Sequence, residues 1–308
     1  MSLIQADARQ IPLADGCAQC VVTSPPYFGL RDYGTANQIG LEPTPDAFVA
    51  ALVAVFREVR RVLKDDGTVW LNLGDSYAGA NTGCAWREGS ARADGDVRGD
   101  GATSRRNRNG NGAVEGVKPK DLLGIPWRVA FALQADGWYL RSDIIWHKPN
   151  PMPESVTDRP TKAHEYLFLL TKSERYFYDA EAVSEQSAGR TDMGRMNFGA
   201  RVNEGGEWKT ERPDVKETRN RRSVWTVATM PYSGAHFATM PEKLVEPCIL
   251  AGSRLGDRVF DPFMGSGTVG AVAERLGRRW VGTDLNPAYH ALARKRTAQR
   301  GLRFEVVA

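Results

Sequence analysis

The chain has 308 residues, of which 42% are hydrophobic, so it is long enough for one large core or two ordinary domains. No apolar run approaches the roughly 20 residues of a membrane span, and the first residues lack the features of a signal peptide, so we expect a cytoplasmic protein. Four cysteines and four scattered histidines suggest neither a disulfide framework nor a metal site. The net charge of +4 permits a polyanionic partner without requiring one.

Helix and strand signals alternate from the first part of the chain onward. Residues 46–64 carry apolar side chains at alternating spacings of four and three, which predicts an amphipathic helix with Thr44 as its N-cap. Residues 68–73 are apolar and β-branched, as in a buried strand. Asp121 is expected to cap a further helix that reaches Gly137.

The same alternation continues to the end of the sequence. We expect an antiparallel pair of strands over 138–146 and 165–172, followed by a helix over 241–251, a strand over 258–261, a helix over 268–276, a strand over 280–284 and a helix over 287–300. Such an order is typical of a doubly wound α/β fold, so we predict a Rossmann-like sheet of about seven strands with flanking helices.

Two polar segments interrupt this order. Residues 78–118 are rich in Gly, Asn, Asp and Arg and have almost no large apolar side chain, so we expect a flexible loop. Residues 186–222 carry nine Lys or Arg against six acidic residues. Taken alone, each segment could be an ordinary solvated surface loop.

A glycine-rich turn between a strand and a helix predicts a nucleotide-like cofactor. Residues 259–268 form this pattern, and Gly265 and Gly267 let the backbone approach a ligand closely. Asp284 ends the next strand, where a carboxylate can accept hydrogen bonds from ribose hydroxyls. Because Asp261 could hold an ammonium, a nucleoside with an amino-acid end fits better than nicotinamide.

A second motif, Ser24-Pro25-Pro26-Tyr27, follows an apolar strand and has the features of a catalytic site. The two prolines lack N–H donors, so nearby carbonyls, especially that of Pro25, can remain free acceptors. Together with Ser24 they could hold the two hydrogens of an aromatic NH₂ group. Tyr27 offers a flat face on which an extruded base could stack.

These two motifs, in this order, resemble the amino-methylating (N4-cytosine or N6-adenine) DNA methyltransferases of the permuted β group. The similarity covers most of the chain, because further matches lie at Asp7 and over 72–75, 144–150 and 236–244. The resemblance implies a circularly permuted, class I S-adenosylmethionine-dependent methyltransferase that flips a base out of double-stranded DNA. Enzymes of this kind serve DNA modification in restriction-modification systems.

The resemblance also implies roles for individual residues. Asp7 would lie near the adenosine, Asp284 on the ribose, and Asp261 and Gly265 near the methionine end. The expected cofactor-binding residues are Asp7, Thr23, Asp261, Pro262, Phe263, Gly265, Gly267, Thr268, Asp284 and Leu285. Many relatives carry glutamate where this chain has Asp284, which makes cofactor affinity less predictable.

The same resemblance divides the chain into a catalytic domain and an insert. Residues 1–185 and 233–308 would form the methyltransferase domain, and residues 186–232 a target-recognition insert whose arginines contact DNA phosphates or guanine edges. The candidate DNA-binding residues are Arg190, Arg195, Arg201, Arg219, Arg221 and Arg222.

Several alternatives stay open or are disfavoured at this point. Ser24 resembles the cytosine-N4 enzymes, but the same acceptors suit adenine N6, RNA or a protein amide. C5-cytosine chemistry needs a reactive cysteine, whereas Cys20 and Cys248 occupy poorly placed, apolar positions. A non-catalytic DNA-binding relic has no reason to keep both motifs. The recognition sequence and oligomeric state, monomer or dimer, cannot be read from the sequence.

Overall fold

The computed structural model describes residues 2–78, 117–187, 217–230 and 240–298. Its elements are β1 (Ser2–Gln5), β2 (Ala18–Thr23), α1 (Pro45–Val62), β3 (Leu63–Leu73), α2 (Ile125–Ala135), β4 (Tyr139–His147), β5 (His164–Thr171), β6 (Glu185–Gln186), β7 (Thr218–Arg219), β8 (Val224–Thr226), α3 (Glu242–Gly252), β9 (Arg258–Asp261), α4 (Thr268–Arg275), β10 (Arg279–Asp284) and α5 (Pro287–Ala298). Eight strands form one sheet in the order β1-β10-β9-β2-β3-β5-β4-β8.

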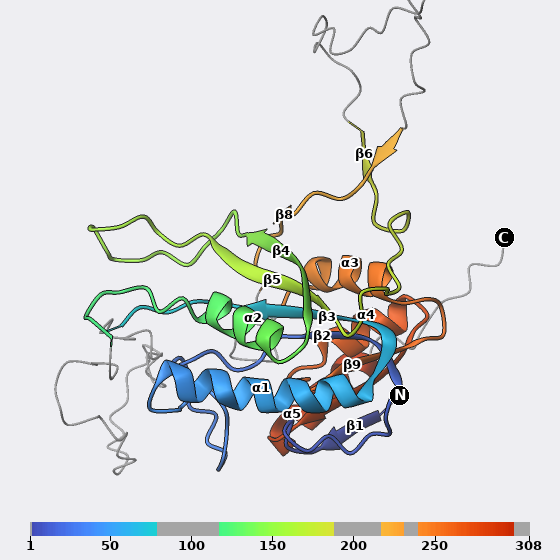
Figure 1. Cartoon of the computed structure of the whole chain (residues 1–308), viewed down its shortest axis with the longest axis horizontal. Helices are drawn as coiled ribbons and strands as arrows, with labels where there is room; N and C mark the ends of the chain where they lie inside the picture. Colours follow the sequence, from blue (N-terminus) through green and yellow to red (C-terminus); the bar gives the residue numbers. More distant parts are fainter. Residues whose placement is uncertain (1, 79–116, 188–216, 231–239, 299–308) are drawn as a thin grey trace, which may run out of the picture.

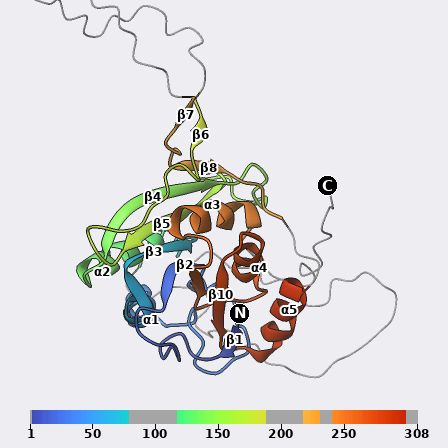
Figure 2. The same ribbon diagram turned by 90° about the vertical axis from the view of Figure 1, so that its right-hand side faces the viewer.

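Helices cover both faces of this sheet, with α1 and α2 on one side and α3 and α4 on the other (Figures 1 and 2). Successive residues of a strand point to opposite faces, and β2 shows the result. Val21 belongs to the cluster that includes Phe48 of α1, whereas Val22 belongs to the cluster that includes Leu244 of α3. Since all of these side chains are fully buried, β2 lies at the centre of a three-layered core.

The strand directions bring one end of most strands to a single edge of the sheet. β1, β10, β9, β2 and β3 are parallel, β5 is antiparallel to β3 and to β4, and β8 is parallel to β4. The predicted α/β sheet and its antiparallel pair are therefore confirmed, with β8 as an additional short edge strand. We call the edge at which β1, β2, β3, β4, β9 and β10 end and β5 begins the catalytic edge.

Helix α1 agrees with the sequence pattern, but the start of α2 does not. Thr44 Oγ1 accepts a hydrogen bond from the amide of Ala47 at 3.2 Å, as expected of an N-cap. Asp121 does not cap α2, because that helix begins at Ile125 after Gly124, whose φ is 68°. Asp75 Oδ1 instead accepts from the amide of Ile125 at 3.0 Å, so the cap comes from the segment after β3.

The segment expected as a separate insert, 186–232, contributes in part to the main sheet. β8 pairs with the end of β4, and Trp225 and Val227 are buried in the core. Residues near the end of this segment therefore belong to the main sheet, while β6 and β7 form a separate pair that projects beyond β8 (Figure 2).

Most of the expected 78–118 loop lies outside the described residues. Of the helices described, none is long and apolar enough to span a membrane.

Candidate active site

The two sequence motifs meet at the catalytic edge through a buried hydrogen bond. Thr23, the last residue of β2, donates from Oγ1 to Asp261 Oδ1 at 2.7 Å, and Asp261 is the last residue of the neighbouring strand β9. Ser24 and the turn that contains Gly265 therefore start from adjacent strand ends. The structure thus brings together segments that lie far apart in the sequence.

The glycine-rich turn is held by two carboxylates that accept hydrogen bonds from backbone amides. Asp261 Oδ1 accepts from the amide of Phe263 at 3.0 Å, and Asp284 Oδ2 accepts from the amide of Gly265 at 2.9 Å. Gly267 has a φ of +84°, and a Cβ at this position would lie 2.9 Å from the Cα of Ala293. The turn is consequently fixed against α5 and depends on glycine at this point.

Burial raises the pKa of both carboxylates. Asp261 is only 3% exposed, and burial raises its pKa to about 7, although the hydrogen bonds from Thr23 and the Phe263 amide oppose the change. Burial also raises the pKa of Asp284. No ion pair to Asp261 occurs among the described residues. A cationic ligand group beside Asp261 would stabilise its ionised form.

The other predicted cofactor residues lie around this turn with partners of their own. Asp7 follows β1 beside Asp284 and forms an ion pair with Arg9 at 2.6 Å, and the hydrogen bonds from Arg9 lower the pKa of Asp7. The Pro262 carbonyl accepts from Thr283 Oγ1, the Leu285 carbonyl from Gln5, and Thr268 Oγ1 from Arg296. Thr268 therefore faces α5 through this bond.

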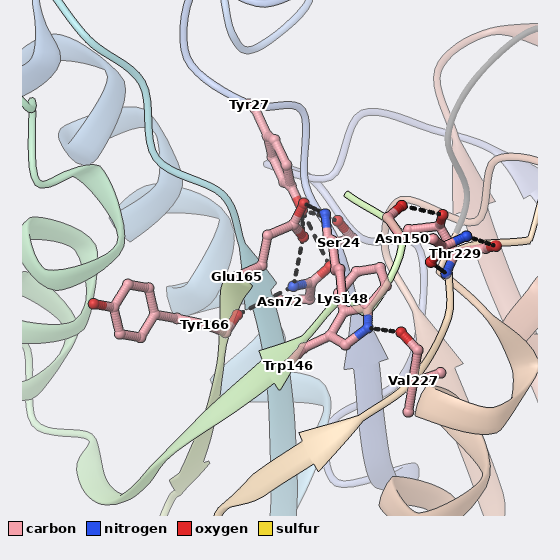
Figure 3. A network of polar contacts seen from close by, with 10 residues as sticks. All are labelled: Ser24, Tyr27, Asn72, Trp146, Lys148, Asn150, Glu165, Tyr166, Val227 and Thr229. Carbon is pink, nitrogen blue, oxygen red and sulfur yellow. Dashed lines mark hydrogen bonds and ion pairs between the residues drawn. The ribbon is translucent and has the colours of Figure 1, made fainter. Parts of the chain in front are cut away.

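A network of polar side chains surrounds Tyr27 (Figure 3). Tyr27 Oη lies 2.7 Å from Glu165 Oε2, to which it donates, and 3.1 Å from Asn72 Oδ1, and Ser24 Oγ donates to Tyr27 Oη at 3.4 Å. Asn72 Nδ2 donates to Glu165 Oε2 at 3.1 Å, and Lys148 Nζ forms an ion pair with Glu165 Oε1. Residues of β3 and β5 are thus joined beside Ser24 to residues that directly follow β2 and β4.

The aromatic ring of Tyr27 is positioned by a glycine. A Cβ at Gly74 would lie 2.6 Å from Tyr27 Cε2, so the ring packs directly on the backbone that follows β3. Burial raises the pKa of Tyr27 well above its usual value, and the neighbouring Glu165 raises it further. The phenol is therefore neutral and keeps its proton.

Neither Glu165 nor Lys148 was identified as a site residue from the sequence. A signal for Glu165 existed, because it is a carboxylate at the start of a strand that is otherwise apolar up to Thr171. Trp146 is 4% exposed, and Lys148 Nζ lies 4.4 Å from its ring centroid. The ring of Trp146 therefore packs against the ammonium group of Lys148.

The candidate DNA-binding arginines fall into two groups. Arg219 and Arg222 form ion pairs with Glu185, at 3.6 and 3.1 Å, and the guanidinium of Arg221 lies 4.6 Å from the ring centroid of Trp225. These three are therefore held beside the projecting β6–β7 pair. Arg190, Arg195 and Arg201 lie outside the described residues.

The two cysteines considered for C5-cytosine chemistry, Cys20 and Cys248, do not provide a nucleophile. Cys20 and Cys248 are fully buried, and burial raises the pKa of Cys20 to about 12 and that of Cys248 well above its usual value. Neither thiol is poised to form the thiolate that C5-cytosine methylation needs. Within the described residues, no group of His, Cys, Asp or Glu could hold a metal ion.

A permuted Rossmann-like sheet with a glycine-rich turn and carboxylates at adjoining strand ends defines a class I methyltransferase. Residues 18–295 match the model of the N6/N4 DNA methylase family, and the chain belongs to this family. The protein is thus a DNA methyltransferase of the N4-cytosine or N6-adenine class.

Individual relatives agree with this assignment. The chain is 50% identical to the type II methyltransferase M.Cfr9I of Citrobacter freundii over 95% of this chain and 86% of that protein. It is 51% identical to M.XycI of Xanthomonas campestris pv. cyanopsidis, over 96% and 87% respectively. Among solved structures, the PvuII DNA methyltransferase (cytosine-N4-specific) has a TM-score of 0.63 at 19% identity, covering 98% of this chain and 88% of that one. At this identity, the structural likeness shows the fold alone.

Proposed function

We propose that the protein transfers a methyl group from S-adenosylmethionine to N4 of a cytosine that is flipped out of double-stranded DNA in the cytoplasm. The observation that carries this proposal is the Thr23–Asp261 hydrogen bond of 2.7 Å, because it sets Ser24 beside the turn expected to hold the cofactor. The choice of cytosine rests on Ser24 at the head of the motif, which resembles the cytosine-N4 enzymes.

The residues at the ends of β9 and β10 fit this cofactor. S-adenosylmethionine supplies a methyl group activated by its sulfonium, together with an ammonium and two ribose hydroxyls. Asp261 offers a buried carboxylate without an ion-pair partner among the described residues, which suits a cation. Asp284 is ordered by the amides of Gly265 and Asn286, each at 2.9 Å, and its remaining lone pairs can accept from ribose.

The turn after β2 offers hydrogen-bond acceptors for the amino group. No hydrogen bond among the described residues ends on the carbonyl oxygen of Pro25, and the hydroxyl oxygen of Ser24 has further lone pairs. Two acceptors hold the two N–H bonds of an exocyclic amine and localise its lone pair on nitrogen. Tyr27, whose ring is placed by Gly74, stacks on the flipped base.

Residues 186–232 are the proposed target-recognition segment. Its arginines Arg190, Arg195, Arg201, Arg219, Arg221 and Arg222 would contact the duplex, chiefly through phosphates. The described part of this segment leaves the sheet next to the end of β4, which itself ends at the catalytic edge. That position would let one duplex contact the segment and present a base to Ser24.

Adenine N6 is the second candidate, because the family includes both activities and the same acceptors suit either amine. The test is to incubate the protein with isotopically labelled cofactor and mixed-sequence duplex DNA, and then to identify the labelled nucleoside by mass spectrometry. We expect N4-methylcytosine. N6-methyladenine would select the second candidate, and label in 5-methylcytosine, in RNA alone or in no nucleic acid would overturn the proposal. Ser24→Ala is the matched control.

A further inference from the structure

The Ser24 hydroxyl can either donate a hydrogen bond to a bound base or accept one from it. A serine hydroxyl can donate one hydrogen bond and can also accept, and its proton turns toward the best acceptor nearby. An amino group needs an acceptor, whereas a base with a carbonyl at the same position needs a donor. Whatever fixes the proton of Ser24 therefore decides which kind of base the site accepts.

Glu165 fixes this direction through Tyr27. The carboxylate of Glu165 can only accept, so the single hydroxyl proton of Tyr27 points to it across the 2.7 Å contact. The oxygen of Tyr27 is then free to accept, and Ser24 Oγ donates to it at 3.4 Å. With its proton directed toward Tyr27, Ser24 presents only lone pairs to a base in the site.

Two further residues hold the Glu165 side chain in place. Lys148 Nζ pairs with Oε1, and Asn72 Nδ2 donates to Oε2 at 3.1 Å while also donating to the carbonyl of Tyr166 at 3.1 Å. The side chains of Lys148 and Glu165 are only 18% and 15% exposed, so each charge depends on the other. The hydrogen bonds that run from Ser24 through Tyr27 therefore end on a carboxylate that Lys148 and Asn72 hold in place.

We propose that Glu165 is a positioning residue that orients the Ser24 hydroxyl as an acceptor and so makes the site selective for amino-bearing bases over their carbonyl counterparts. This inference rests on the proposed function. It predicts that one isosteric substitution can reverse the direction of the hydrogen bonds between Ser24, Tyr27 and residue 165.

Glu165→Gln is that change. The ammonium of Lys148 can only donate, so it holds the amide oxygen of the new side chain and turns the NH₂ group toward Tyr27. Tyr27 then accepts a hydrogen bond from this group and donates one through its own hydroxyl to Ser24 Oγ, so that the Ser24 proton points to the base. Asn72 must then turn its amide so that Oδ1 accepts from the new NH₂ group, and it gives up its hydrogen bond to the Tyr166 carbonyl.

The experiment uses the duplex in which the labelling test locates the methyl group. Affinity is measured without methyl donor for that duplex and for one with the carbonyl counterpart at the target, uracil for cytosine or hypoxanthine for adenine. We expect the wild type to favour the amino base by about tenfold, since a mismatched donor or acceptor costs about that much. Glu165→Gln should lose or reverse this preference with an unchanged affinity for S-adenosylmethionine.

Tyr27→Phe provides the control, because it removes the hydroxyl that transmits the effect while keeping the ring. By itself it should lower the preference, and in its background Glu165→Gln should have no additional effect. An undiminished preference in either single variant would overturn the inference, and if Glu165→Gln does not fold, Tyr27→Phe decides alone. A wild type that methylates no duplex contradicts the proposed function instead, so the two failures are distinguishable.

Discussion

The cofactor half and the catalytic half of the site are built differently. In the cofactor half, Asp261 and Asp284 bind backbone amides 2 and 19 residues away in the chain. In the catalytic half, Glu165 binds Tyr27 and Asn72, which are 138 and 93 residues away. The first is a local turn set by its own sequence, whereas the second exists only once four strands are assembled. We therefore expect the two halves to fail separately when mutated.

The largest separation is expected from Tyr27→Ala. Loss of the ring and the hydroxyl removes both the stacking surface and the link from Ser24 to Glu165, so turnover on duplex DNA should fall by about 100-fold or more. Affinity for S-adenosylmethionine, measured by calorimetry, should stay within about twofold, because no contact of Tyr27 reaches Asp261 or Asp284. Unchanged turnover would remove the stacking role.

Asp284→Ala should act on the other half. The alanine removes the acceptor for the ribose and also the two backbone contacts that order Gly265 and Asn286, so cofactor affinity should fall by about 10- to 100-fold. Asp284→Glu is the matched control, since it keeps the charge and should lose much less. An unaltered affinity of the alanine variant in calorimetry would count against the ribose assignment.

The pKa of about 7 for Asp261 predicts a pH-dependent cofactor affinity. Below that pH the carboxyl is protonated and must lose its proton to face an ammonium, so affinity should fall about tenfold per pH unit and level off above pH 7. Asp261→Asn should bind more weakly above pH 7 and lose this dependence. A wild-type affinity that is flat from pH 5 to 8 would contradict the assignment.

The same carboxyl makes a prediction about stability. Its folded pKa lies above its unfolded value of about 4, so its contribution to stability is present at low pH and is lost as pH rises through 7. Asp261→Asn should therefore gain about 2–4 kcal/mol of unfolding free energy relative to the wild type on going from pH 4 to pH 8. Urea unfolding at the two pH values measures this difference.

The smallest effect is expected where the two halves join. Thr23→Val keeps the shape of the side chain but removes the donor to Asp261, which should cost about 1–2 kcal/mol in urea unfolding. Turnover and cofactor affinity should both decline, because the bond links both halves. A change in only one of them would show that the halves are independent even at this contact. Thr23→Ser keeps the donor and serves as the control.

More of the cofactor half than of the catalytic half could be predicted from the sequence. The strand, turn and helix around Gly265 follow from local pattern, and β9 has the bounds that were predicted for it. The cap of α2 was wrong because Asp75, distant in the chain, took the place assigned to Asp121. Glu165 was missed for the same reason, since only the pairing of β5 with β3 and β4 places it beside Tyr27.

The central position of β2 has a consequence for biosynthesis. β2 lies between β3 and β9, and the hydrogen-bond partner of Thr23, Asp261, lies 238 residues further along the chain. Until β9 has been synthesised, one edge of β2 has no neighbouring strand, and strands of other molecules could pair with it. The sequence order that sets the catalytic motif before the cofactor motif thus delays completion of the central sheet until β9 has been synthesised.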